Sequence, residues 1–194
     1  MPRSREDARR RLQQAALELF HERGYEATTT AEIAARAGLT ERTFFRHFPD
    51  KREALFDGEE VFRAALSDAV LAAPEDLSPM GALLWAFRSV ERMLEDNRSF
   101  SEPRQAVIAR NPALQERVLT KTAGLINALS EALRGRGVDD GIAALAAQVG
   151  MAAFGYAASA WFDDPTPGLA AHLTRAFDEL HDLSSTIRKP GLNG

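Results

Sequence analysis

The sequence contains no cysteine and no spacing of side chains that would bind a metal. None of its 194 residues is Cys, which excludes disulfides, thiolate metal sites and cysteine nucleophiles. Its four histidines show no metal-ligand spacing with one another or with nearby carboxylates; they are His21, His47, His172 and His181. We therefore expect no metal site.

Motifs of catalysis, cofactor binding and membrane insertion are also missing. There is no G-x-S-x-G elbow, no P-loop and no dinucleotide-binding glycine motif. No uninterrupted apolar run approaches the roughly 20 residues of a membrane span, and the basic N-terminal sequence lacks the apolar stretch of a secretory signal. We expect a cytoplasmic protein that is not an enzyme, binds no cofactor and has no membrane partner.

Basic residues gather at the N-terminal end, although the chain as a whole is acidic. The net charge is −4, yet residues 1–52 hold 11 Lys and Arg against 8 Asp and Glu. The remaining residues hold 13 against 20. A basic end on an acidic chain is expected when that end binds nucleic acid.

Apolar residues recur at helical spacing, and no alternating run is long enough for a convincing strand. We predict an all-α fold of about nine helices, with a three-helix domain over residues 1–50 and a second helical domain over 51–194. Residues 51–71 should form one long helix in which Gly58 either permits close packing, the favoured alternative, or marks a bend. Residues 97–103 should be a break, and Thr166 and Pro167 should start the last helix.

Residues 29–48 have the make-up of two short helices joined by a tight turn. Thr29 and Glu32 form a capping box at the start of the first helix. Gly38 lets the chain turn at positive φ without a Cβ penalty, and Thr40 caps the second helix. The segment is therefore predicted to be a helix-turn-helix.

The second helix of this motif has an apolar face and a polar, cationic one. Phe44 and Phe48 fall on the inward face. The side chains left for a partner are Glu41, Arg42, Thr43, Arg46 and His47. Such a helix suits a DNA major groove, where Arg can donate two hydrogen bonds to guanine and Thr can contact a thymine methyl group or a phosphate.

Further cations flank the motif. Arg3 and Arg5 precede the first helix, and they are either part of a solvated basic face or an arm that contacts the minor groove or phosphates. Lys51 is expected in the first turn of a helix capped by Asp50, where a phosphate would be favoured.

The same residues resemble a known family. Gly24-Tyr25, the run Thr43-Phe44-Phe45-Arg46-His47-Phe48, and Lys51 resemble the DNA-binding domain of the TetR family of bacterial regulators, over about a quarter of the chain. The family often has tyrosine where this sequence has Phe45, which has no hydroxyl to donate to a phosphate. Pattern and resemblance together predict DNA contacts by Arg3, Arg5, Thr29, Thr40, Glu41, Arg42, Thr43, Phe45, Arg46, His47 and Lys51.

The helix expected over residues 139–162 is apolar nearly all round, so it has to be covered on two sides. We expect one side to pack inside the chain. The other should meet its symmetry mate in a four-helix bundle with the last helix. The predicted dimer interface comprises Ile142, Val149, Tyr156, Leu169, Leu173, Phe177 and Leu180.

A ligand pocket is predicted between the helices of the second domain, although aromatic residues at helical spacing are more often simply core. Its candidate residues are Phe62, Trp85, Phe87, Asn127, Gln148, Met151 and Phe154. The segment TERTFFRHFP and the alanine-rich helix ending in Ala-Trp-Phe resemble the mycofactocin-associated regulators. That resemblance implies an effector that is acyl-CoA-like.

The sequence thus predicts a dimeric regulator that binds double-stranded DNA. By family resemblance it is a repressor, released from a palindromic operator by a small apolar or amphipathic ligand. The alternative is an all-helical small-molecule carrier or enzyme in which the helix-turn-helix is structural. Salt separates the two, because duplex binding by a regulator weakens steeply as salt rises, whereas a carrier shows no such binding.

Overall fold

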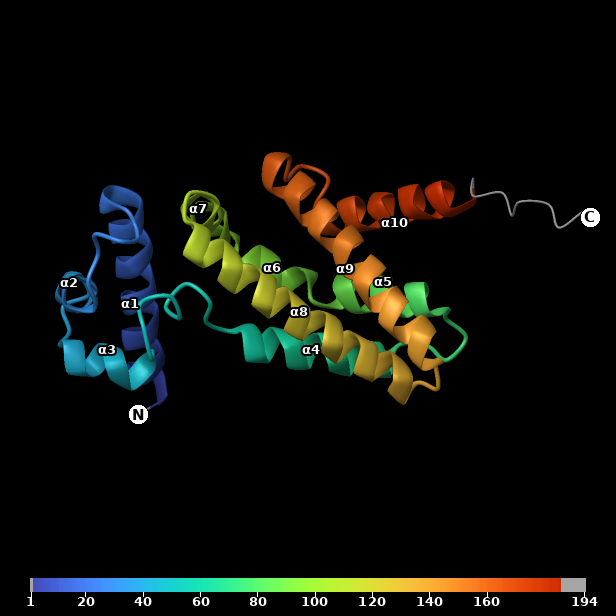
Figure 1. Cartoon of the computed structure of the whole chain (residues 1–194), viewed down its shortest axis with the longest axis horizontal. Coiled ribbons are helices and arrows are strands. Elements are labelled where there is room, and N and C mark those ends of the chain that lie inside the picture. The colour runs from blue at the N-terminus through green and yellow to red at the C-terminus, as the bar shows by residue number, and fades with distance from the viewer. Residues whose placement is uncertain (1, 186–194) are drawn as a thin grey trace, which may run out of the picture. The chain divides into compact units, whose positions relative to one another are not determined.

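The computed structural model describes residues 2–185, with side chains from residue 5, and over this range it contains ten α-helices and no strand (Figure 1). The helices are α1 (Pro2–Arg23), α2 (Thr30–Arg36), α3 (Glu41–His47), α4 (Glu59–Ala72), α5 (Pro79–Ser89), α6 (Glu91–Asp96), α7 (Arg98–Ala109), α8 (Pro112–Gly135), α9 (Asp140–Asp163) and α10 (Leu169–Ser185). The predicted all-α class is confirmed. The described residues form ten helices where about nine were expected.

Two helices start later than predicted. Residues 51–58 form turns, and α4 begins at Glu59. Gly58 has φ +83° and lies outside the helix, and a Cβ there would meet nothing within 4 Å, so the expectation of close packing at this glycine is wrong. α10 begins at Leu169, after Gly168 has turned the chain at φ +77°.

Residues 98–109 are helical although a break was expected over 97–103. α7 runs through Pro103, which cannot donate a main-chain hydrogen bond. The helix buries Ser101 and Val107 and packs Phe100 against a hydrophobic core. Burial of one helix face therefore outweighs the local effect of the proline.

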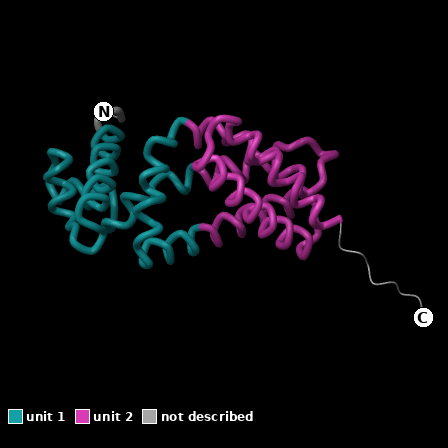
Figure 2. Tube along the Cα trace, turned by 90° about the horizontal axis from the view of Figure 1, so that it is seen from above, with its two compact units in different colours: residues 1–61, 96–121 teal, residues 62–95, 122–194 magenta. Residues whose placement is uncertain are grey.

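The chain forms two compact units (Figure 2). Unit 1 comprises Met1–Val61 and Asp96–Lys121, and unit 2 comprises Phe62–Glu95 and Thr122–Gly194. α4 and α8 consequently have residues in both units. The predicted functional boundary at residue 50 falls inside unit 1 and stays a prediction.

The core of unit 1 is aromatic at its centre. Phe44 and Phe48 of α3 are 0% and 2% exposed, and their ring centroids lie 5.6 Å apart. Phe20 of α1 packs with them, and Leu114 of α8 joins the same core. Full burial of one such side chain contributes about 1.5–3 kcal/mol, so the inner face of α3 fixes how this helix sits in unit 1.

His47, the last residue of α3, belongs to this buried face. It is 8% exposed, and both ring nitrogens are buried without a hydrogen-bond partner. The prediction that it contacts DNA is therefore wrong for this conformation. Burial, together with the charges of Arg46, Arg5 and Arg9, lowers the pKa of His47 below 6.5, while Asp57 acts in the opposite direction.

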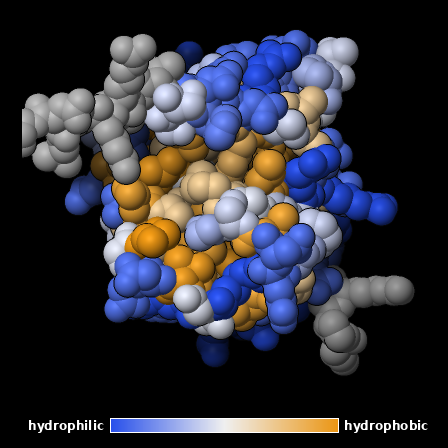
Figure 3. All heavy atoms as spheres, turned by 90° about the vertical axis from the view of Figure 1, so that its right-hand side faces the viewer, coloured by the Kyte–Doolittle hydropathy of each residue, from blue (hydrophilic) through white to orange (hydrophobic). Residues whose placement is uncertain are grey.

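α9 has one buried and one exposed apolar face. Its length and composition would suffice to cross a membrane, but Ala143, Ala147 and Ala157 pack in the core of unit 2, as expected for a core helix. Ile142, Leu145 and Tyr156 are 55%, 63% and 58% exposed. Figure 3 shows a continuous hydrophobic area, bordered by hydrophilic residues, on the face of unit 2 turned toward the viewer.

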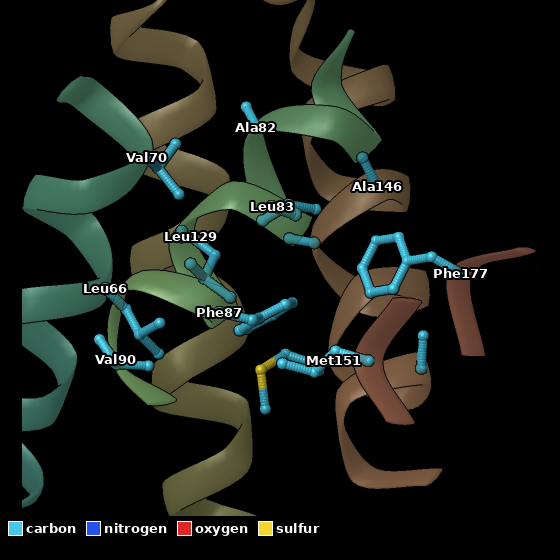
Figure 4. Packing of buried hydrophobic residues seen from close by; sticks show 14 of the residues in the cluster. Leu66, Val70, Ala82, Leu83, Phe87, Val90, Leu129, Ala146, Met151 and Phe177 are labelled. Atoms are coloured by element: carbon cyan, nitrogen blue, oxygen red, sulfur yellow. The ribbon is translucent and has the colours of Figure 1, made fainter. Parts of the chain in front are cut away.

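The core of unit 2 forms where α5, α9 and α10 meet. Figure 4 shows Phe87, Met151 and Phe177 converging from these three helices, and the Phe87 and Phe177 ring centroids lie 6.2 Å apart. Leu169 and Leu173 are fully buried in the same core. Because Leu169, Leu173 and Phe177 are buried within one chain, the expectation that they form a dimer interface is wrong.

The contact between α5 and α9 leaves no room for a side chain at Gly150. A Cβ there would lie 2.7 Å from Leu83 Cδ1, in a position where Leu83 is 0% exposed. We predict that Gly150→Ala lowers the free energy of unfolding by about 1–3 kcal/mol through overpacking. Gly124→Ala in α8, with nothing within 4 Å of the new Cβ, should raise it by up to about 1 kcal/mol. Urea unfolding of both variants measures the difference, and equal effects would refute the packing argument.

The buried imidazole of His47 predicts an acid-sensitive stability. The unfolded chain binds a proton at His47 near pH 6.5, whereas the folded chain binds it only at lower pH. The free energy of unfolding should therefore be fully retained above pH 6.5 and decrease as the pH falls below 6.5. The total loss is about 1.4 kcal/mol per unit of difference between the unfolded and folded pKa values of His47. His47→Leu should flatten this dependence in urea unfolding between pH 5 and 7.5, and His21→Gln, at an exposed histidine, should not. An unchanged slope in His47→Leu would contradict the assignment.

Candidate nucleic-acid interface

The first helix of the motif starts as the sequence predicts. The Thr29 hydroxyl accepts a hydrogen bond from Glu32 N at 3.2 Å, and Glu32 Oε2 accepts one from Thr29 N at 2.9 Å. This reciprocal capping box provides hydrogen-bond acceptors for two backbone N–H groups that have no partner within the helix. The hydrogen bonds that the Thr29 N–H and hydroxyl donate to the Glu32 carboxylate lower the pKa of Glu32.

The turn between α2 and α3 depends on one glycine and one arginine. Gly38 has φ +65°, and its N–H donates to Ala35 O at 2.9 Å while Leu39 N donates to Ala34 O at 2.8 Å. From α1, the Arg11 guanidinium donates to Ala37 O, and a Cβ on Gly38 would lie 2.8 Å from it. Arg11 thereby fixes the turn that sets the angle between the two helices.

α3 is capped by Thr40 and held by its aromatic inner face. Thr40 Oγ1 accepts a hydrogen bond from Thr43 N at 3.2 Å, and the Thr40 and Thr43 hydroxyls are 3.0 Å apart. Since Phe44 and Phe48 point into the core, the rest of the helix faces solvent. The burial of Phe44 and Phe48 thus determines which face of α3 is exposed to solvent.

This outward face carries two cations and one exposed ring. Arg42 and Arg46 are exposed, and Phe45 is 54% exposed. Glu41 is also exposed, but its Oε1 accepts a hydrogen bond from the Thr30 hydroxyl at 2.6 Å, which links the first turns of α3 and α2. The face offers guanidinium donors and an apolar ring in one row, as a groove-reading helix requires.

A cleft of about 480 Å³ lies beside α3. It is lined by Arg5, Asp7, Ala8, Arg11, Leu39, Thr43 and Arg46. Three predicted DNA-contacting residues, Arg5, Thr43 and Arg46, are therefore brought together from α1 and α3. The side chain of Arg3, also predicted, lies outside the described residues.

Lys51 is used inside the protein. It lies in a turn, not in the first turn of a helix, so that part of the prediction is wrong. Its ammonium donates to Tyr25 O at 2.7 Å, Thr28 O at 3.0 Å and Glu26 O at 3.4 Å, and it sits 4.3 Å from the centre of the Tyr25 ring. All three N–H groups are directed at carbonyls, so in this conformation Lys51 holds the α1–α2 connection in place.

The predicted ligand-pocket residues separate into two groups. Phe154 lies 4.8 Å from Phe87 and 6.3 Å from Phe62, measured between ring centroids, and Met151 belongs to the same core. The structure does not place the remaining three with them: Trp85, Asn127 and Gln148 are exposed. Asn127 and Gln148 face solvent and are therefore not buried polar groups of a pocket.

The sequence did not predict the residues that stabilise the candidate interface through contacts with distant parts of the chain. The contact of Arg11 with Ala37 O and the pairing of Arg9 with Asp57 were not foreseen. The only signal for Asp57 was its place beside Gly58, which suggests a turn. Partners 48 residues apart cannot be paired from one sequence.

Comparison with known proteins gives two family matches. Residues 12–57 match the bacterial regulatory proteins of the tetR family. Residues 77–184, more than half of the chain, match the MftR C-terminal domain. The first match covers the helix-turn-helix and the second covers most of unit 2 together with α7.

Two curated regulators are similar in sequence. The HTH-type transcriptional regulator TcmR of Streptomyces glaucescens is 30% identical over 138 residues, which cover 68% of this chain and 61% of TcmR. The uncharacterized HTH-type transcriptional regulator YvkB of Bacillus subtilis is 46% identical over 60 residues, covering 29% of this chain and 32% of YvkB. The chain thus spans less than two thirds of the length of either relative.

Solved structures share the fold. Thermus thermophilus FadR, a TetR-family transcriptional repressor in complex with lauroyl-CoA, has a TM-score of 0.57 at 24% identity, with 96% of this chain and 100% of that chain covered. The SmeT–triclosan complex has a TM-score of 0.60 at 19% identity, covering 96% and 99%. Together with the two family matches, the exposed cationic face of the helix-turn-helix leads to one conclusion: the chain belongs to the TetR family of bacterial transcriptional regulators and has an MftR-type C-terminal domain.

Proposed function

We propose that this regulator is a homodimeric repressor that binds a palindromic operator and leaves it when a small amphipathic ligand binds unit 2. The observation that supports DNA binding most strongly is the outward face of α3, where Arg42 and Arg46 remain exposed while the opposite face is buried. The two guanidinium groups on that exposed face can donate hydrogen bonds to phosphates and base edges. The protein would act in the cytoplasm, where bacterial DNA lies.

In this proposal Arg42 and Thr43 face base edges in the major groove. Arg5 and Arg46, which line the cleft beside α3, contact phosphates on one flank. Thr29 and Thr40 lie at the N-terminal ends of α2 and α3, where free N–H groups favour a phosphate. Phe45 contributes apolar contact with sugars or a thymine methyl group, in place of a hydrogen bond.

A second copy of the chain is proposed to cover the exposed face of α9. Ile142, Leu145, Val149 and Tyr156 follow one another at steps of three, four and seven residues, so they form one stripe along the helix. Leu183 on α10 is 69% exposed. A two-fold axis through this face would pair identical stripes and place two copies of α3 for half-sites roughly 34–36 Å apart, or a multiple of that distance.

The proposed effector is acyl-CoA-like or another amphipathic molecule. The aromatic cluster of Phe62, Phe87 and Phe154, with Met151, provides the apolar lining that such a chain would need. Support comes from two proteins of the same fold, whose structures contain lauroyl-CoA and triclosan. A ligand shifts the regulator only as far as its affinities for the bound and released conformations differ.

Duplex binding tests the first part of the proposal. A duplex selected from a random pool should bind with an affinity that falls steeply as salt rises, because phosphate contacts release counterions. Arg42→Ala should cost about 1–3 kcal/mol and relax the preference at one base pair. Arg88→Ala, at an exposed arginine of α5, is the matched control and should bind like the parent. Identical binding by parent and Arg42→Ala would refute the assignment of α3.

The oligomeric state tests the second part. We expect the parent to sediment as a dimer. Leu145→Glu should raise the dimer dissociation constant at least about tenfold, because each substitution occurs twice in a two-fold symmetric interface. Leu119→Glu changes an equally apolar side chain, 71% exposed on α8, and should leave the dimer intact. A monomeric parent, or a dimer unaffected by Leu145→Glu, would show that α9 is not the interface.

A further inference from the structure

The segment that follows α3 has no regular helix of its own. Residues 49–58, called the joining segment here, connect α3 to α4 through turns. Three of its side chains are buried in the core of unit 1: Ala54, Leu55 and Phe56. Because α3 ends at His47, any shift of this segment acts directly on the C-terminal end of α3, the helix proposed to contact the major groove.

Cationic side chains from α8 hold the joining segment. Arg117 Nε donates to Glu53 Oε1 at 2.8 Å. The Lys121 ammonium pairs with Glu59, lies 3.5 Å from Glu53 Oε2, and lies 5.3 Å from the centre of the Phe56 ring. These four charged residues, Glu53, Glu59, Arg117 and Lys121, are called the α8 clamp.

The clamp is more buried than a surface ion pair. The side chain of Lys121 is 13% exposed, and those of Glu53 and Glu59 are 19% and 23% exposed. By comparison, Arg134 and Asp140 at the other end of α8 are 45% and 85% exposed. Apolar side chains of similar size would stabilise such a site as well or better, so what charges add is a defined register between the parts they join.

α7 contributes one more contact to the same segment. The guanidinium of Arg104 is buried, donates to Leu55 O at 3.0 Å, and leaves its Nε without a partner. Burial lowers the pKa of this group. The joining segment is thus held from outside the helix-turn-helix at Glu53, Leu55 and Phe56, and the first residue of α4, Glu59, is held with it.

α8 itself has side chains in both cores. Leu114 is fully buried in the core of unit 1, and Leu129 and Leu133 are buried in the core of unit 2. α8 runs without interruption from Pro112 to Gly135, so Arg117 and Lys121 lie on the same helix as Leu129 and Leu133.

We propose that Arg117 and Lys121 are positioning residues for DNA binding: through Glu53 and Glu59 they set the separation at which the reading helices of two copies engage paired half-sites. They touch no DNA themselves. This inference rests on the proposed dimeric DNA-binding function and adds to it the side chains that hold the segment after α3.

A purely stabilising cluster would behave differently from a positioning one. Loss of stability lowers the concentration of folded protein, so it weakens binding to every duplex by the same factor. Loss of positioning changes the preference among duplexes that differ only in the spacer. Each added base pair moves one half-site by about 3.4 Å and turns it by roughly 35°, so spacing is a sensitive measure.

The experiment compares duplexes that carry the two half-sites selected by the parent, with spacers lengthened or shortened by one and two base pairs. The variants are Lys121→Met, Arg117→Gln and the exchange pair Lys121→Glu with Glu59→Lys. Arg134→Gln is the matched control, an arginine of the same helix with an exposed partner. Urea unfolding identifies the variants that are folded at the assay temperature, and Arg117→Gln, at the more exposed of the two cations, is the variant expected to keep its fold.

We expect the parent and Arg134→Gln to prefer one spacer by about tenfold or more over its neighbours, a difference of about 1.4 kcal/mol. In Lys121→Met and Arg117→Gln this preference should shrink to about twofold or less, equivalent to roughly 0.4 kcal/mol. The exchange pair should recover part of it. An unchanged spacer preference in a folded clamp variant would overturn the positioning role. A parent that binds no paired half-sites would instead overturn the proposed function.

Discussion

The interface depends on the burial of one face of α3. Phe44 and Phe48 are 0% and 2% exposed in the core of unit 1, and this fixes the rotation of a helix only seven residues long. A helix this short is not stable by itself in water, so its packing supplies both its stability and its orientation. Arg42 and Arg46 face outward because the aromatic side chains face inward.

The apolar core fixes the rotation of α3, and polar contacts determine where α2 and α3 begin and how they are oriented. Capping by Thr29 and Thr40 sets where α2 and α3 begin, and Gly38 with Arg11 sets the angle between them. The caps join residues three positions apart, whereas Arg11 and Ala37 are 26 residues apart, and each contact is worth on the order of 1 kcal/mol. Lys51 belongs with them, since its ammonium satisfies carbonyls at the α1–α2 connection.

Unit 2 packs differently from the aromatic core of unit 1, because small residues allow its helices to approach closely. α9 carries Gly150 against Leu83 and a row of alanines against α5 and α10, while its other side keeps Ile142, Leu145 and Tyr156 in solvent. In the proposed dimer a second copy covers this exposed stripe, and the aromatic cluster inside unit 2 is the proposed site of the effector.

The sequence by itself determined the helical class, the helix-turn-helix with its caps and turn glycine, and the outward positions of Glu41, Arg42 and Arg46 on α3. These features depend on contacts within a few residues, which periodicity and capping chemistry describe completely. Tertiary structure alone decided that α7 passes through Pro103, that His47 is buried, that Leu169 and Leu173 lie inside the chain, and that Lys121 reaches Glu53 and Glu59. In each of these cases the deciding partner lies far away along the chain. One sequence does not reveal which helix covers which face, because burial is a property of the packed molecule and not of the segment.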